Sequence, residues 1–318
     1  MLDSQAIDAR AGHLATRFAA GLFDFSFMGQ FEVSGPAARA FLERVQTRTL
    51  APLAPGKLCY TLLLREDGSV FNDATVWCLA PERYWMFTGR PADFDWISQC
   101  QLAAEARLER LSGQFSILAL QGPRCFDLIE TRLPYFGFAK AQVEGERVWM
   151  ARLGYSGELG VEILVPVEAG AALWERLRNK GVRECGFEAA NSLRIESGYI
   201  LFMNELPAMP DPFELGLGKL VTGRGFVGAE ALEKKRFAGP RRKLVGLVPT
   251  GSTRAPGGLP EALLTSEAYS PVFGWILGMG FAPAEHAAPG NLLRLADGRL
   301  AHSARLPFYD PGRLLPRR

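Results

Sequence analysis

Between residues 147 and 167, two apolar runs are separated by a glycine-rich turn, and this pattern constrains the fold more than any other part of the sequence. The turn contains three glycines, Gly154, Gly157 and Gly160. Glycine tolerates positive φ and close backbone approach, so the pattern predicts a strand, a tight turn and a returning strand. An ordinary hairpin is one interpretation. A ligand site is the other, because Tyr155 and Glu162 supply an aromatic ring and a carboxylate suited to a flat heterocycle.

The composition predicts a multidomain α+β protein. A chain of 318 residues with 48% hydrophobic content can bury a large core, and its length indicates two or three domains. Strand-like runs at 59–64, 70–79 and 83–88 mix with helix-like segments such as 124–131. This mixture lacks the strict alternation of a parallel sheet, so we expect an α+β fold.

A composition change near residue 239 predicts a domain boundary. Beyond Gly239-Pro240 the chain is rich in glycine and proline and has only short apolar runs, which is typical of a small all-β domain. We therefore divide the chain into residues 1–238 and a C-terminal β-barrel domain of residues 239–318.

The net charge of +2 provides no bulk attraction to nucleic acid. Three basic clusters are interpreted as solvated surface, or alternatively as sites that attract an anionic ligand such as a polyglutamate tail. These clusters are 234–236, 241–243 and 317–318.

The scattered cysteines and histidines predict neither a metal site nor disulfides. None of the five cysteines forms a C-x-x-C pair, and the three histidines lie far apart.

The N-terminus lacks the basic and apolar segments of a secretory signal. No apolar run approaches the roughly 20 residues of a membrane helix. We therefore expect a cytoplasmic protein with no membrane and no nucleic-acid partner.

Asp73 is the principal candidate for catalysis. It lies in the apolar run 70–76, where a charged residue is costly unless it is paired or used. Strand alternation places Asp73 and Asn72 on opposite faces, so one of the two must face inward. A structural or exposed aspartate remains the alternative interpretation.

Several segments, in one order along the chain, resemble the folate-dependent aminomethyltransferases, the family of the glycine cleavage T-protein. Residues 154–162 resemble the G-Y-T-G-E-x-G-x-E signature of that family, and residues 60–77 resemble its Y-x-x-x-x-N-x-x-G-G-x-x-D-D block. Further similar segments are 22–30, 120–123, 193–196, 212–217, 226–232 and 307–309.

This resemblance implies a T-protein-like α+β fold, with three domains around a central folate channel and the first two interleaved in sequence. It implies an enzyme that transfers an aminomethyl or methyl group from a small methylated or aminomethyl donor to tetrahydrofolate. Asp73 matches the catalytic carboxylate of the family, near N5 and N10 of the folate. Tyr155 and Glu162 match residues that contact the pterin, and Tyr60 and Tyr199 match tyrosines near the channel.

Departures from the family pattern concern the donor. Ala190 and Gly89 stand near the positions of a family arginine and asparagine, which predicts a roomier and less polar site. Residues 189–199 resemble more closely the folate domains of sarcosine- and dimethylglycine-oxidising enzymes. The predicted partner is therefore a carrier or an oxidising protein. Arg194 and Glu196, two apart on a helix, cannot share a face, and we interpret both as structural.

Two alternatives to the transferase remain open. One is a non-catalytic folate-binding or regulatory protein, or a subunit that channels one-carbon units to tetrahydrofolate. The other is a protein that kept the scaffold and lost folate.

Overall fold

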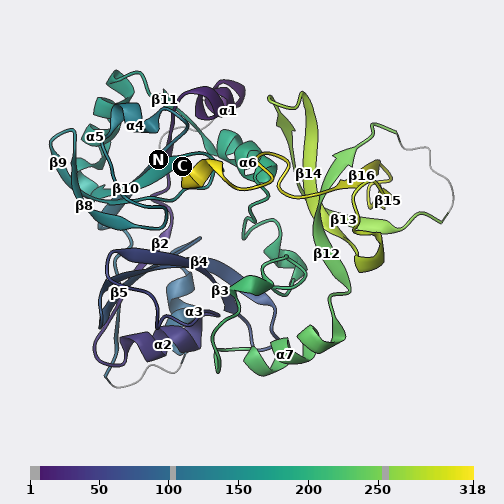
Figure 1. The fold of residues 1–318 in the computed structure, drawn as a ribbon, viewed down its shortest axis with the longest axis horizontal. Coiled ribbons are helices and arrows are strands. Elements are labelled where there is room, and N and C mark those ends of the chain that lie inside the picture. Colours follow the sequence, from purple (N-terminus) through teal and green to yellow (C-terminus); the bar gives the residue numbers. More distant parts are fainter. Residues whose placement is uncertain (1–7, 101–104, 253–257) are drawn as a thin grey trace.

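The chain forms a mixed six-stranded sheet, an antiparallel five-stranded sheet and a closed barrel, which surround the centre of the molecule (Figure 1). The computed structural model describes residues 8–100, 105–252 and 258–318. The expectation that the N-terminus carries no secretory signal rests on residues 1–7, which lie outside the described residues. None of the helices in the described part of the chain has the length and apolarity needed to span a bilayer.

The first unit is a six-stranded sheet in the order β11-β1-β7-β10-β9-β8. Its strands are β1 (Gly21–Asp24), β7 (Phe115–Gln121), β8 (Phe138–Val143), β9 (Glu146–Ala151), β10 (Gly160–Pro166) and β11 (Arg183–Glu184). Its helices are α1 (Ala9–Phe18), α4 (Cys125–Leu128), α5 (Val167–Asn179) and α6 (Phe187–Glu196). The predicted helix at 124–131 was too long, since α4 ends at Leu128.

The second unit is inserted between β1 and β7 of the first, so the two units interleave in sequence as expected. It is a five-stranded sheet in the order β3-β4-β5-β2-β6. Its elements are β2 (Gly29–Ser34), α2 (Ala38–Val45), β3 (Lys57–Leu64), β4 (Val70–Ala80), β5 (Arg83–Thr88), α3 (Asp93–Gln99) and β6 (Arg107–Arg110).

The third unit is a closed barrel in the order β12-β14-β13-β15-β16. Its strands are β12 (Arg242–Pro249), β13 (Glu261–Ser270), β14 (Trp275–Pro283), β15 (Leu292–Leu295) and β16 (Leu300–Ala304), and α7 (Ala229–Ala238) precedes it. Short 3-10 helices are η2 (Leu206–Ala208), η3 (Gly218–Leu220), η4 (Ala284–His286) and η5 (Leu315–Arg317). After the barrel, the C-terminal segment returns to the first unit, where Arg152 donates hydrogen bonds to the carbonyl oxygens of Pro316 and Arg318.

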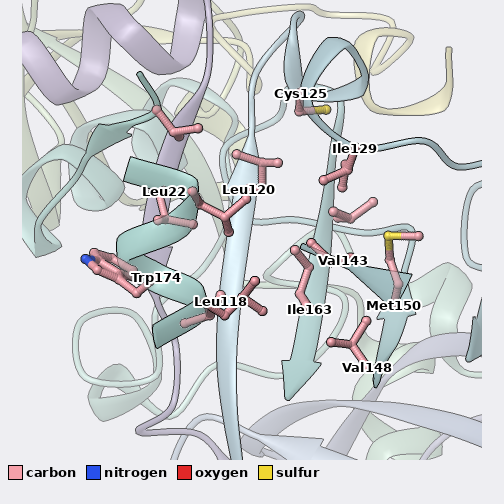
Figure 2. Close-up of a cluster of buried hydrophobic side chains, with 14 of the residues drawn as sticks. Leu22, Leu118, Leu120, Cys125, Ile129, Val143, Val148, Met150, Ile163 and Trp174 are labelled. Carbon is pink, nitrogen blue, oxygen red and sulfur yellow. The ribbon is translucent and has the colours of Figure 1, made fainter. Parts of the chain in front are cut away.

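Strand alternation gives each sheet two different faces. On β10, Val161, Ile163 and Val165 pack with Leu173 and Trp174 of α5 in one core (Figure 2). Each such side chain contributes about 1.5–3 kcal/mol by leaving water.

The opposite faces of the two sheets pack against each other. Leu164 and Ala151 of the first sheet join Trp77, Trp85 and Phe87 of the second in one apolar cluster. This inter-sheet cluster therefore fixes the position of one sheet relative to the other.

Candidate functional site

The glycine-rich turn between β9 and β10 is built around the side chain of Gln121. A Cβ at Gly154 or Gly160 would lie 1.8 Å or 2.5 Å from the amide group of Gln121, so a larger residue at either position would displace this amide. That amide nitrogen donates hydrogen bonds to the carbonyl oxygens of Leu153 and Val161, on the two sides of the turn. The predicted strand–turn–strand is thus confirmed, and the glycines are explained by the glutamine that they enclose.

The turn presents Tyr155 to a second tyrosine. The rings of Tyr155 and Tyr199 stack with centroids 5.9 Å apart, and Phe25 meets Tyr155 edge-on at 6.5 Å. The Tyr155 hydroxyl donates to the carbonyl oxygen of Ile200 at 2.5 Å. The guanidinium of Arg313 lies 5.0 Å from the Tyr199 ring centroid. These aromatic rings hold each other in fixed positions beside the turn.

Asp73 lies on the face of the second sheet that looks toward the first. On β4 it alternates with Ala74 and Val76, which pack in the core beneath α2 and α3. Its Oδ2 atom accepts a hydrogen bond from the Tyr60 hydroxyl at 2.9 Å. Burial raises the pKa of Asp73 to about 6, although the Tyr60 hydrogen bond opposes this effect. A carboxyl group with such a pKa can hold or release a proton near neutral pH.

Glu162 lies on the face of the first sheet that looks toward the second. Its directly paired neighbours are Ala119 and Ala151, and Ala119 pairs in turn with Phe23, so these residues form one row across the sheet. The Glu162 residue is 7% exposed. Among the described residues none donates a hydrogen bond to its carboxyl group, and burial alone raises its pKa to about 7.

The structure thus brings four of the five predicted site residues into one interacting group. Tyr60 and Asp73 share a hydrogen bond. Burial raises the pKa of Tyr60 well above its usual value, and the nearby Asp73, Tyr155 and Tyr199 raise it further. Neither a hydrogen bond nor an ion pair joins the Glu162 side chain to these four described residues, but Glu162 lies on the inner face of the opposing sheet.

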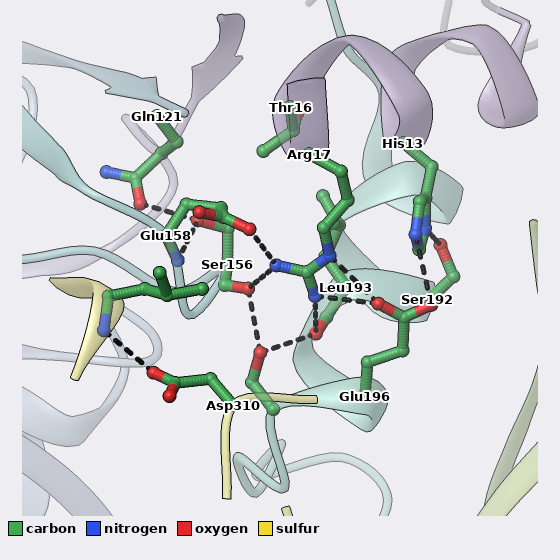
Figure 3. Close-up of polar contacts among 12 residues, drawn as sticks. His13, Thr16, Arg17, Gln121, Ser156, Glu158, Ser192, Leu193, Glu196 and Asp310 are labelled. Carbon is green, nitrogen blue, oxygen red and sulfur yellow. Dashed lines mark hydrogen bonds and ion pairs between the residues drawn. The ribbon is translucent and has the colours of Figure 1, made fainter. Parts of the chain in front are cut away.

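A buried ionic network joins the turn between β9 and β10 to helices α1 and α6 (Figure 3). Arg17 of α1 donates to the carbonyl oxygen of Ser156 at 3.0 Å and to Glu158 at 2.9 Å. It also contacts Glu196 of α6 at 2.7 Å, and His13 lies 3.0 Å from the same carboxylate. Burial raises the pKa of Glu196, but the His13 hydrogen bond and the Arg17 charge together hold it below its usual value.

The structural interpretation of Arg194 and Glu196 agrees with these contacts. Arg194 points away from Glu196 and pairs with Glu205 at 3.0 Å, with both side chains fully buried. It also donates to Ser266 of β13 at 2.7 Å, so α6 is bonded to the barrel on one side and to α1 on the other.

The expectation of extra room at Gly89 was wrong. A Cβ at this position would lie 2.5 Å from the Phe202 ring, so that ring already fills the space. The space beside Ala190 is also too narrow to hold a water molecule, and its lining is mainly apolar. The residues around it are Phe23, Phe25, Gln121, Tyr155, Ser156, Ala190 and Leu193.

Phe202 and the buried Asp93 were not predicted as parts of the site. Phe202 lies in an irregular segment without periodicity, so its position depends on tertiary packing. Asp93 follows a proline-containing turn, where an acidic residue is usual at a helix start and carries no specific signal. Asp93 nevertheless is fully buried and contacts Asn72, the neighbour of Asp73.

Comparison with known proteins gives one consistent result. The family model of the GCVT N-terminal domain matches residues 5–224. The aminomethyltransferase of Symbiobacterium thermophilum is 35% identical, and the match covers 93% of this chain and 88% of that protein. The aminomethyltransferase of Bacteroides thetaiotaomicron is 33% identical, and the match covers 88% of this chain and 84% of that protein.

A solved structure agrees over nearly the whole fold. The crystal structure of glycine cleavage system aminomethyltransferase T from Bartonella henselae matches with a TM-score of 0.84 and 27% identity. The match covers 96% of this chain and 91% of that one. The chain belongs to the aminomethyltransferase family and is an enzyme of the T-protein-like kind.

Proposed function

We propose that this enzyme transfers a one-carbon unit, aminomethyl or methyl, to tetrahydrofolate bound between the two sheets. The observation that carries the proposal is Glu162, a buried carboxyl group without a hydrogen-bond donor among the described residues. Such a group costs free energy unless a ligand satisfies it. The aminomethyltransferase relatives support the same reaction class.

The residues present fit the pterin end of a folate. A carboxylate accepts two N–H donors side by side, and the 2-amino group and ring N–H of a pterin form such a pair. We assign this contact to Glu162. The stacked rings of Tyr155 and Tyr199 are proposed to line the site for the rest of the ligand, and Tyr60 lies beside them.

Asp73 is proposed as the catalytic carboxylate. Tetrahydrofolate, when bound, supplies the N5 and N10 nitrogens that take up the one-carbon unit. Asp73 holds or removes a proton at its Oδ atoms, and its negative charge stabilises positive charge that develops nearby. Tyr60 holds the carboxyl group in place through its 2.9 Å hydrogen bond. The adjoining inter-sheet cluster excludes water from this side of the site.

A small methylated or aminomethyl compound is the proposed donor, in the cytoplasm, with a carrier or oxidising protein as the proposed partner. The space at Ala190 is lined mainly by apolar groups, and its Gln121 and Ser156 are already bonded to each other. An apolar lining offers a polar aminomethyl donor few hydrogen-bond partners, so it binds such a donor weakly. We therefore expect little activity with an aminomethyl-lipoyl carrier protein. Robust, folate-dependent ammonia release from that carrier would overturn this part of the proposal.

The test is single-turnover transfer to tetrahydrofolate from candidate donors, with the wild type and Asp73→Asn. We expect Asp73→Asn to bind folate and to lose about 10²-fold or more in rate. An unchanged rate with a verified donor removes Asp73 from the mechanism. Folate binding without turnover for any donor would favour the non-catalytic folate-binding alternative, and a wild type that binds no reduced folate would favour a scaffold that lost folate.

A further inference from the structure

Asp73 lies at the place where β4 loses one of its neighbouring strands. Pairing between β4 and β5 starts at Ala74, opposite Thr88, so Asp73 lies one residue beyond it. The backbone N–H of Asp73 donates instead to Oδ1 of Asn72 at 2.9 Å. The orientation of the proposed catalytic residue therefore depends on the side chain that precedes it.

Asn72 is held in turn by a buried carboxylate from α3. Its amide nitrogen donates to Oδ2 of Asp93 at 2.5 Å, and both residues are fully buried. The other oxygen of Asp93 accepts a hydrogen bond from Nε of Arg90 at 2.8 Å. The Arg90 guanidinium is partly exposed and lies over the rings of Phe71 and Phe202, at 5.7 Å and 5.5 Å.

The chemistry of this chain of contacts requires an amide at position 72. An aspartate there would place two carboxylates against each other in a buried space, which is strongly unfavourable. The Asn72 amide can donate to Asp93 and accept from the Asp73 backbone at the same time. Replacing Asn72 by a residue without this donor and acceptor, or Asp93 by a residue without an acceptor, would leave a buried polar atom without a partner.

We propose that Asn72 and Asp93 are positioning residues for Asp73: the buried amide–carboxylate pair fixes the end of β4 so that the Asp73 carboxyl group meets the Tyr60 hydroxyl. This inference rests on the proposed function for its catalytic meaning. The titratable groups that interact with Asp73 come from three elements. They are Tyr60 on β3, Asp93 on α3 and Tyr155 in the turn before β10.

The test follows the Asp73 carboxyl group directly by ¹³C NMR titration of the ligand-free protein labelled with ¹³C-aspartate. The Asp73 signal is assigned by its absence from Asp73→Asn. Asp93→Asn removes a negative charge near Asp73, so its titration midpoint moves to lower pH. Arg90→Gln keeps Asp93 but removes the neutralising cation, so the midpoint moves to higher pH. Asp95→Asn, on the same helix but exposed, is the matched control and leaves the midpoint unchanged.

Turnover provides the second readout. Asn72→Ala lowers kcat by about 10- to 100-fold with little change in KM for tetrahydrofolate, because misplacing a catalytic group costs rate more than binding. Asn179→Ala, at an exposed position, is the control. An Asp73 midpoint that moves to higher pH in folded Asn72→Ala, which changes no charge but loosens the contact with Tyr60, supports the proposal. Identical Asp73 titrations in folded Asn72→Ala, Asp93→Asn and Arg90→Gln overturn it.

Different results would refute the catalytic role of Asp73 and the positioning role of Asn72 and Asp93. An Asp73→Asn variant with full turnover would refute the catalytic role of Asp73, whereas the NMR titration still decides whether Asn72 and Asp93 position it. If Asp93→Asn does not fold, the partly exposed Arg90 provides a variant that leaves the buried pair intact.

Discussion

Glu162→Gln should stabilise the ligand-free protein at alkaline pH while it weakens folate binding. Burial raises the pKa of Glu162 from 4.5 to about 7. Because the folded-state pKa is the higher one, this contribution to stability is fully present below about pH 4.5 and is lost as pH rises through about 7. At about 1.4 kcal/mol for each pKa unit, the wild type loses about 3 kcal/mol of unfolding free energy across this window. Glutamine does not titrate, so the variant escapes this loss.

Urea denaturation of both proteins at pH 5 and pH 8 measures the effect. The difference in unfolding free energy between variant and wild type should become more favourable to the variant by about 2–3 kcal/mol at the higher pH. Glu261→Gln makes the same chemical change at an exposed position on the barrel and serves as the control. Parallel pH dependence for the wild type and Glu162→Gln would refute the assignment of Glu162 as a buried carboxyl group without a partner.

Three further predictions concern the surroundings of the site. Tyr60→Phe removes the hydrogen bond that opposes the raised pKa of Asp73, so this pKa should rise above about 6 and the inflection of the pH–rate profile should move to higher pH; an inflection that does not move would show that Tyr60 does not affect the titration of Asp73. Glu196→Gln breaks a buried ion pair and should lower the unfolding free energy by about 3–5 kcal/mol in urea denaturation, whereas a loss below about 1 kcal/mol would show that the pair contributes little. Gly89→Ala drives a methyl group into the Phe202 ring and should lower the unfolding free energy by about 1–3 kcal/mol. Adding Phe202→Leu should recover part of that loss, and no recovery would place the strain elsewhere.

The local elements of this fold could be predicted from sequence because their signals are local. The strand predicted at 83–88 matches β5, and those predicted at 59–64 and 70–79 lie within β3 and β4. Turn glycines and strand alternation depend on neighbouring residues only. The change in composition near residue 239 likewise precedes the barrel, although the division of the chain at that residue stays a prediction.

The assembly of the site could not be predicted in the same way. That Tyr60 bonds to Asp73 follows from the register between β3 and β4, which no single strand pattern specifies. The Phe202 ring fills the space at Gly89, although more than a hundred residues separate the two in sequence. A smaller residue than the family pattern has therefore shows where a site differs. It enlarges the site only where no neighbouring side chain occupies the space. The roles of Tyr60, Asp73 and Glu162 remain proposals.

Calorimetric titration with tetrahydrofolate under anaerobic conditions tests the central claim most directly, using the wild type, Glu162→Gln and Glu261→Gln. The account predicts saturable binding by the wild type and by Glu261→Gln. It predicts binding weaker by about 1.5–3 kcal/mol for Glu162→Gln, the scale of a hydrogen bond to a charged group. No binding by the wild type, or equal affinity for all three proteins, would contradict a folate site on the inner face of the first sheet.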